Sequence, residues 1–144
     1  MSGVDPGLFT QVTIPSDTQE ARKVQDEIEA HLQTRLASEK EIFSVRLALE
    51  EALVNAIKHG NQMDRTKKVH ISYRFVGNRL DIQITDEGNG FDPSDVPDPT
   101  AVENLERPCG RGLMLMRHYM GDVNYNERGN SVSMSKVFQT NGKL

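Results

Sequence analysis

Two pairs of alternating segments, each joined by a Gly-Asn dipeptide, constrain the fold more than any other feature of the sequence. Apolar and polar residues alternate over 69–76 and 79–85 around Gly77-Asn78, and over 122–127 and 131–138 around Gly129-Asn130. Short alternating runs with a turn of this kind between them are typical of β-hairpins. The segment 8–14 alternates as well and is followed by Pro15, so we expect it to be an edge strand.

Three helices are expected between and after these strands, over 16–36, 38–59 and 113–120. Ser16 is followed three residues later by Gln19, which matches the capping box that satisfies the first amides of a helix. Ser38 and Glu41 repeat the pattern at the start of the second helix. We expect Gly60 to end that helix in a left-handed conformation.

One domain of 144 residues accounts for all of these elements. Their order, β-α-α-β-β-loop-α-β-β, predicts an α+β sandwich of two layers, with a mainly antiparallel mixed sheet and the helices on one face. No apolar run approaches the roughly 20 residues of a membrane span, and the first ten residues lack an export signal. With one cysteine and a net charge of -4, we expect a cytoplasmic protein with no membrane or direct nucleic-acid partner.

The second expected helix carries a carboxylate beside an amide. Its apolar residues cluster on the side that we expect to face the sheet, and the opposite wedge holds Ser44, Glu51, Asn55, Lys58 and His59. Glu51 and Asn55 lie one turn apart, so their side chains are neighbours. The wedge is either the solvated face of an amphipathic helix or a site where the carboxylate accepts a proton and the amide oxygen binds Mg²⁺.

Two glycine-rich segments bound a long polar insertion at about 87–111, which we interpret as a lid or binding loop. At its start, Asp86-Glu87-Gly88-Asn89-Gly90 combines glycines, which allow close approach, with an aspartate that could accept a hydrogen bond from a base. The alternative is a simple Asp-initiated turn. At its end, the segment 107–112 leads into a helix, where backbone amides can cradle phosphates or merely form a hinge.

Taken in order, four motifs resemble the GHKL ATP-binding superfamily of gyrase, histidine kinases and MutL. They are Glu51-x-x-x-Asn55, Asp86-x-Gly88-x-Gly90, Gly110-x-Gly112 and Gly129-Asn130-Ser131-Val132. Within that superfamily, the segments 50–60 and 105–107 resemble the bacterial anti-sigma factor serine kinases of the sporulation and general-stress type. The likeness covers nearly the whole chain and implies the Bergerat ATP-binding fold.

The resemblance implies roles for several of these residues. Asn55 would hold Mg²⁺ at the phosphates of ATP, and Glu51 would orient or deprotonate the serine hydroxyl of a partner protein. Asp86 would bind the adenine amine. The other implied contacts are Gly88 and Gly90 at the base pocket, Gly110, Arg111 and Gly112 around the phosphates, Arg107 at the γ-phosphate or the partner, and Ser131 at the adenine.

The function implied by the resemblance is that of an ATP-dependent serine kinase and anti-sigma factor with ATP and Mg²⁺ as cofactors. It would phosphorylate an anti-anti-sigma partner of the STAS type and sequester a sigma factor. A homodimer follows from the resemblance alone, because the sequence carries no diagnostic apolar seam. Two alternatives stay open, namely an ATP-gated binding module without phosphoryl transfer and an α+β scaffold without a nucleotide site.

Overall fold

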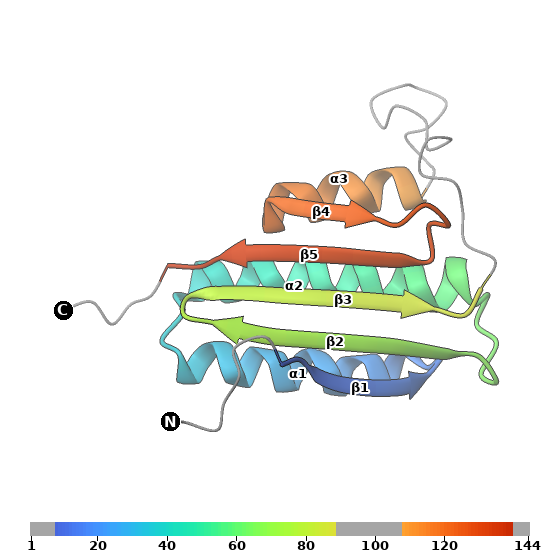
Figure 1. Ribbon diagram of the computed structural model, residues 1–144, viewed down its shortest axis with the longest axis horizontal. Coiled ribbons are helices and arrows are strands. Elements are labelled where there is room, and N and C mark those ends of the chain that lie inside the picture. The colour runs from blue at the N-terminus through green and yellow to red at the C-terminus, as the bar shows by residue number, and fades with distance from the viewer. Residues whose placement is uncertain (1–7, 89–107, 140–144) are drawn as a thin grey trace.

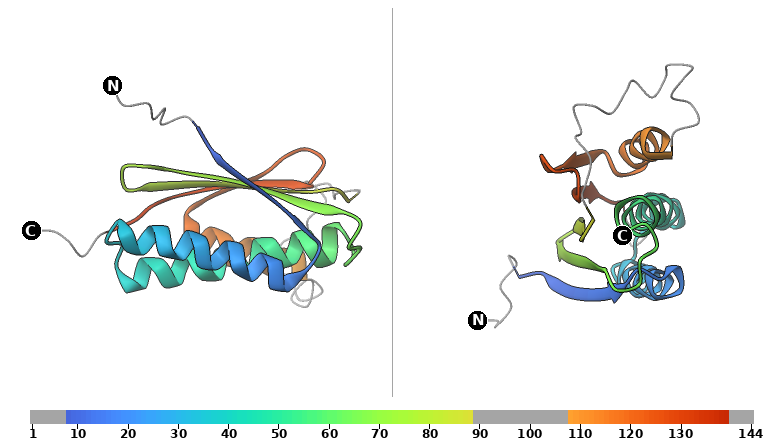
Figure 2. Two further views of the ribbon diagram at one scale, coloured as in Figure 1. Left: turned by 90° about the horizontal axis from the view of Figure 1, so that it is seen from below. Right: turned by 90° about the vertical axis from the view of Figure 1, so that its right-hand side faces the viewer.

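The computed structural model describes residues 8–88 and 108–139, which form one layer of strands and one layer of helices (Figure 1). The strands are β1 (Thr10–Pro15), β2 (Lys68–Val76), β3 (Arg79–Asp86), β4 (Asp122–Tyr125) and β5 (Ser131–Val137). The helical segments are α1 (Thr18–Thr34), α2 (Glu39–Val54), the π-helix η1 (Asn55–Gly60) and α3 (Pro108–Met120). Figure 2 shows the helices side by side on one face of the sheet, with α2 in the middle. The predicted two-layer α+β sandwich is confirmed.

The sheet has the order β1-β2-β3-β5-β4, and each neighbouring pair of strands is antiparallel. Both predicted hairpins are present. Gly77 and Gly129 adopt positive φ angles of 59° and 74° in their turns, a conformation that glycine reaches without steric cost. The strand predicted at the edge is β1, and the other edge is β4.

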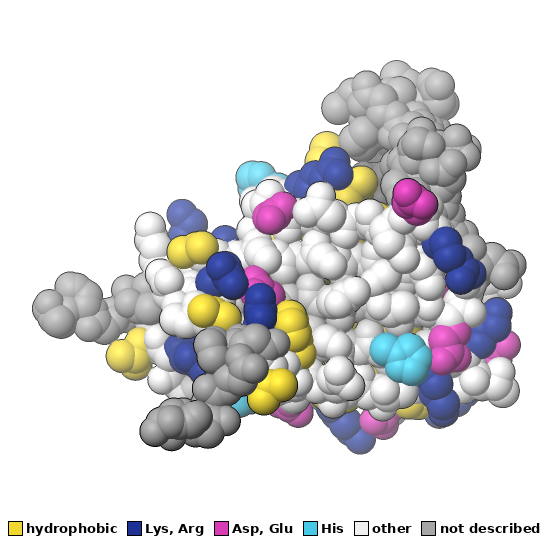
Figure 3. All heavy atoms as spheres, in the orientation of Figure 1, with side chains coloured by type: hydrophobic (Ala, Val, Ile, Leu, Met, Phe, Trp, Pro, Cys, Tyr) yellow, Lys and Arg dark blue, Asp and Glu magenta, His cyan; other side chains and the backbone are white. Residues whose placement is uncertain are grey.

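The core lies between the sheet and the helices because alternate side chains of each strand point to opposite faces. Buried residues on the helix side include Ile71 and Tyr73 of β2, Leu80, Ile82 and Ile84 of β3, Met134 of β5, and Leu49, Leu53 and Ile57 of the second helix. The other face of the sheet is open, and its centre carries few hydrophobic or charged side chains (Figure 3). Polar residues such as Ser72, Gln83 and Ser133 pair across that face.

The start of α1 differs from the prediction. Asp17, not Ser16, is the N-cap, and its carboxylate accepts a hydrogen bond of 2.8 Å from the amide of Gln19. A carboxylate is favoured there because its charge also interacts with the positive end of the helix dipole. Ser16 is instead buried, and its hydroxyl donates to the carbonyl of Lys67 at 2.7 Å. The predicted capping role of Ser16 was therefore wrong.

The second helix begins as predicted and ends differently. The Ser38 hydroxyl accepts a hydrogen bond from the Glu41 amide at 3.3 Å, which confirms the predicted cap. The last turn is the π-helix η1, a rare form that occurs mostly as single turns and often at functional sites. Gly60 is inside η1 and is not left-handed; positive φ angles occur instead at Gln62 and Met63. The prediction for Gly60 was wrong.

The third helix is longer than predicted. It begins at Pro108 rather than at residue 113, so residues 108–112 belong to the helix and not to a loop before it. Proline suits a first helical turn, because it has no amide hydrogen to leave unpaired and its φ angle is already helical. Gly121 ends the helix as predicted, with a φ of 94° and its amide bonded to the Arg117 carbonyl at 3.0 Å. Within residues 8–88 and 108–139, none of the helices combines the length and apolar character that crossing a bilayer requires.

Candidate functional site

Several elements meet at one end of the sheet, on the right of Figure 1. They are η1, the last residues of β3, the turn between β4 and β5, and the start of α3. The contacts agree with this view, since η1 touches both β3 and α3. The carboxylate and amide of the second helix and the aspartate at the end of β3 are therefore brought to the same region of the molecule.

Asn55, the first residue of η1, is buried with 9% of its surface exposed. A solvated helix face, one of the two interpretations of the wedge, does not extend to this position, because the second helix lies between α1 and α3. Ser44 of the same wedge is also buried. Within the described part of the chain, the Asn55 Oδ1 atom has no hydrogen-bond partner. A buried acceptor without a partner costs about 1–3 kcal/mol, so an atom of this kind points to a missing donor or cation.

Glu51 lies one turn before Asn55. The Asn55 amide bonds to the carbonyls of Glu51 and Ala52, so the helical spacing that places the two side chains on one face is retained. Burial raises the pKa of the Glu51 carboxyl above its usual value, and the negative charge of Glu50 raises it further, while the charge of His59 lowers it. A carboxylate with a raised pKa is a better proton acceptor than one in water.

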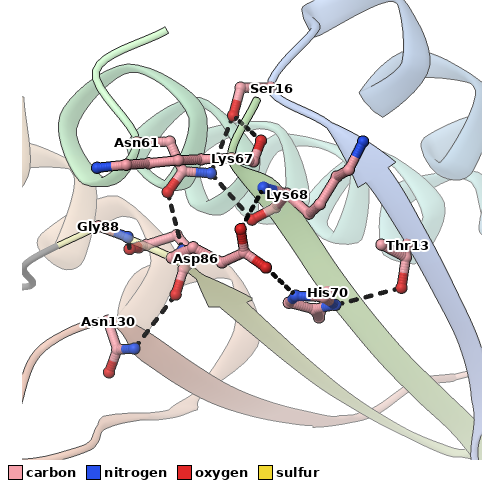
Figure 4. Close-up of polar contacts among 10 residues, drawn as sticks. Thr13, Ser16, Asn61, Lys67, Lys68, His70, Asp86, Gly88 and Asn130 are labelled. Carbon is pink, nitrogen blue, oxygen red and sulfur yellow. Dashed lines mark hydrogen bonds and ion pairs between the residues drawn. The ribbon is translucent and has the colours of Figure 1, made fainter. Parts of the chain in front are cut away.

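Asp86 ends β3, and two glycines make room for its buried carboxylate. The Gly88 amide donates to Asp86 Oδ1 at 2.9 Å (Figure 4). A Cβ atom on Gly60 would lie 2.2 Å from Asp86 Oδ2, and a Cβ atom on Gly88 would lie 1.8 Å from the Gly60 carbonyl oxygen. Burial raises the pKa of the Asp86 carboxyl, and the Gly88 amide lowers it, as do the charges of Arg128 and Lys67.

Asn130 is a neighbour of Asp86 that the sequence analysis did not assign to the site. The Asp86 amide donates to the Asn130 carbonyl at 2.8 Å, and the Asn130 side chain donates to the Asp86 carbonyl at 3.2 Å (Figure 4). Ser131 pairs with Thr85, and their hydroxyls lie 2.7 Å apart. Since Thr85 and Asp86 point to opposite faces of the sheet, the structure does not bring the Ser131 side chain to Asp86. The prediction for Ser131 depended on the register of β3 and β5, which pairs Ser131 with Thr85 and which the motif alone does not give.

Asn61, just after η1, is a second residue that the sequence analysis missed. It is completely buried, and its Oδ1 accepts a hydrogen bond of 2.8 Å from the Glu87 amide (Figure 4). No periodicity marks this position, because the residue belongs to neither a helix nor a strand. Its signal in the sequence is limited to its place beside Gly60.

The remaining predicted site residues are only partly covered by the structure. Gly90 and Arg107, together with most of the expected lid, lie outside the described residues. The backbone of Gly110, Arg111 and Gly112 is helical and belongs to the first half of α3. The first amides of a helix have no partners inside it, so the amides that were expected to contact an anion from a loop lie here at the start of a helix.

The chemistry of the described residues fits Mg²⁺ bound together with a phosphate ligand. The unpaired Asn55 Oδ1 is a hard oxygen ligand of the kind that Mg²⁺ accepts. In the described ranges there is no group of three His, Cys, Asp or Glu side chains that could hold a metal by itself. A magnesium ion here would take most of its ligands from phosphate oxygens and water, as this ion commonly does.

Comparison with known proteins decides the family. The model of the histidine kinase-like ATPase domain matches residues 14–136, which is most of the chain. The chain belongs to this family. Among solved structures, the RsbU and RsbW domains of Rv1364c from Mycobacterium tuberculosis superpose with a TM-score of 0.62 and 14% identity over 91% of this chain and 33% of that one. This likeness supports the fold that the family implies.

Two curated relatives of this ATPase-domain protein are named as kinases. Serine/threonine-protein kinase BtrW of Bordetella bronchiseptica is 31% identical over 88 residues, which cover 60% of this chain and 62% of that protein. Serine-protein kinase RsbW of Bacillus subtilis is 31% identical over 103 residues, which cover 67% of this chain and 64% of that protein. The matches thus span less than two thirds of the length of either relative.

Proposed function

We propose that this member of the histidine kinase-like ATPase family is an ATP-dependent protein serine kinase that also acts as an anti-sigma factor. The observation that carries the proposal is the buried Asn55 Oδ1 without a partner among the described residues, one helical turn from the half-buried Glu51. On a solvated helix face, this oxygen would be exposed and hydrogen-bonded to water. The two relatives are named as a serine/threonine-protein kinase and a serine-protein kinase, which supports the same activity.

The proposed nucleotide contacts follow from the chemistry of the residues. Asp86 offers a buried carboxylate as the acceptor for the exocyclic amine of adenine, and Gly60 and Gly88 leave the space that its orientation needs. Asn55 would hold Mg²⁺, which supplies positive charge to the phosphates when it is bound. The amides at the start of α3 are candidates for the remaining phosphate contacts.

Glu51 is the proposed base. As the serine oxygen of the partner attacks the γ-phosphorus and ADP leaves, the Glu51 carboxylate accepts the proton of the hydroxyl. Its raised pKa suits this role, because burial destabilises the ionised carboxylate and so favours uptake of the proton. Phosphoryl transfer needs mainly positioning and charge neutralisation, so one base, one metal ligand and a few amides suffice.

The proposed partners are a STAS-type anti-anti-sigma protein, which would carry the phosphorylated serine, and a sigma factor, which the chain would sequester. They rest on the resemblance of the motifs to anti-sigma factor kinases, supported by similarity to RsbW proteins. Such partners act in the cytoplasm, and the proposal includes that location.

The experiment that tests this function compares Glu51→Ala with Glu50→Ala. Glu50 is an exposed carboxylate next in sequence, so its variant controls for loss of charge and for changes in the helix. We expect Glu51→Ala to lose phosphoryl transfer from radiolabelled ATP to the serine partner while its ATP affinity stays within about twofold, and Glu50→Ala to keep both. Full transfer by Glu51→Ala would refute the base assignment. A wild-type protein that binds ATP and transfers nothing to any candidate partner would instead favour the ATP-gated binding module.

A further inference from the structure

The Asn61 side chain is hydrogen-bonded to three of the segments around the Asp86 carboxylate, those of Ser16, Lys68 and Glu87. Its Nδ2 donates to Ser16 Oγ at 2.9 Å and to the Lys68 carbonyl at 3.0 Å, and its Oδ1 accepts from the Glu87 amide at 2.8 Å. Its own amide bonds to the Ala56 carbonyl at 2.8 Å and closes η1. Because the side chain is fully buried and uses its donors and its acceptor, it has a single orientation.

These contacts act on the place where the strand ladder stops. Asp86 is the last residue of β3, and Asn130 fixes both its amide and its carbonyl. The next peptide lies beyond the ladder, and its amide, on Glu87, bonds to Asn61. Glu87 is also held through its exposed carboxylate, which accepts from the Lys68 amide at 2.8 Å, but water competes for that contact.

The orientation of the Asp86 carboxylate depends on this peptide. Once the Glu87 amide is held, the chain turns so that the Gly88 amide reaches Asp86 Oδ1 at 2.9 Å. Gly60, which packs against the same carboxylate, is bonded covalently to Asn61. The Asn61 side chain thus holds the turn that bonds to the carboxylate (Figure 4). Its bonds to Ser16 and Lys68 also fix the residue that follows Gly60, which packs against the same carboxylate.

We propose that Asn61 is a positioning residue for base selection, which holds the Asp86 carboxylate in the orientation that accepts a hydrogen bond from the exocyclic amine of adenine. The inference rests on the proposed function, because it takes Asp86 as the adenine ligand. Asn61 does not touch the nucleotide in this proposal, and its effect passes through Glu87 and Gly88 to Asp86.

The test compares the affinity for ATP with the affinity for purine riboside triphosphate, which lacks the exocyclic amine. A hydrogen bond to a charged group should make the wild-type protein prefer ATP by about 10- to 150-fold. We expect Asn61→Ala to lower this preference to less than about threefold. A residue that only stabilised the fold would weaken the binding of both nucleotides equally and leave their ratio unchanged.

Asn78→Ala is the matched control. The Asn78 side chain also donates to a backbone carbonyl, that of Phe138 at 3.2 Å, but it lies in the β2–β3 turn at the opposite end of the sheet. We expect this variant to keep the wild-type preference for ATP. An equal loss of preference in Asn78→Ala and Asn61→Ala would show that the ratio follows stability, and it would overturn the inference.

The outcomes separate this inference from the proposed function. If the wild-type protein prefers ATP and Asn61→Ala keeps the full preference, Asn61 does not position Asp86. If the wild-type protein itself has no preference, the adenine site fails, and the inference fails with it. If Asn61→Ala does not fold, the same ratio is measured in Ser16→Ala, which removes one hydrogen-bond acceptor of the Asn61 side-chain Nδ2. We expect a smaller loss of ATP preference in that variant, and an unchanged ratio would overturn the inference.

Discussion

Replacement of Gly60 by alanine is expected to weaken ATP binding more than it lowers the free energy of unfolding. The new Cβ atom would lie 2.2 Å from Asp86 Oδ2 and 2.3 Å from Asp86 Cγ, whereas ordinary contacts begin at 3.4 Å. The carboxylate must therefore move by about 1 Å. It cannot do so freely, because it is buried and Oδ1 is held by the Gly88 amide.

The expected magnitudes come from two opposing effects on the free protein and one on the complex. Overpacking costs about 1–3 kcal/mol, and alanine in place of glycine within a helical segment returns about 1 kcal/mol. The net loss of stability should thus be about 0–2 kcal/mol. The hydrogen bond from adenine to a charged group is worth about 1.5–3 kcal/mol, and its loss corresponds to roughly 10- to 150-fold weaker ATP binding.

Isothermal titration calorimetry with ATP and Mg²⁺ measures this effect, with Gly77→Ala as the control. Gly77 has a φ of 59°, and a Cβ atom added to it would meet no atom of the described residues within 4 Å. Alanine there should cost about 1–2 kcal/mol of backbone strain without a clash. The control should lose stability and keep its ATP affinity. ATP binding by Gly60→Ala within about twofold of wild type would refute the proposed role of Asp86.

Two further predictions concern pH and a helix cap. The rate of phosphoryl transfer should fall as the pH falls through the raised pKa of Glu51, because the base must be ionised. Since the negative charge of Glu50 raises that pKa, Glu50→Gln should move this limb of the pH–rate profile to lower pH. An unmoved limb would contradict the assignment of Glu51. Ser38→Ala should lower the free energy of unfolding in urea by about 1 kcal/mol without affecting ATP affinity. A loss of less than about 0.3 kcal/mol would contradict the capping role of Ser38.

Local features of the fold could be predicted from the sequence, because their causes are local. The hairpin turns depend on glycines that reach positive φ angles, and the cap of the second helix depends on a hydroxyl three residues before an amide. Where two neighbouring residues compete for one role, the pattern failed. Ser16 and Asp17 both suit an N-cap, and the choice depends on Lys67 and Asn61, which occupy the Ser16 hydroxyl in the folded chain.

The candidate site was less predictable, because it depends on contacts between distant segments. Gly60 was interpreted as a helix end, but its lack of a side chain is required by Asp86 from another strand. The burial of Asn55 follows from the position of α3, which the helical wheel does not contain. Asn61 and Asn130 act through hydrogen bonds between their side chains and the backbone of Glu87 and Asp86, which only the strand register and the fold bring close to them.

The role of Asn55 can be measured as the dependence of ATP affinity on Mg²⁺ in the wild-type protein and in Asn55→Ala. We expect Mg²⁺ to strengthen ATP binding by the wild-type protein and to have no such effect on the variant. We also expect the variant without ligand to be at least as stable as the wild-type protein. The unpaired Asn55 Oδ1, which has no partner in the described structure, costs the wild type about 1–3 kcal/mol, and the substitution removes this atom. A variant that keeps the full effect of Mg²⁺ on ATP binding would show that Asn55 does not hold the metal ion.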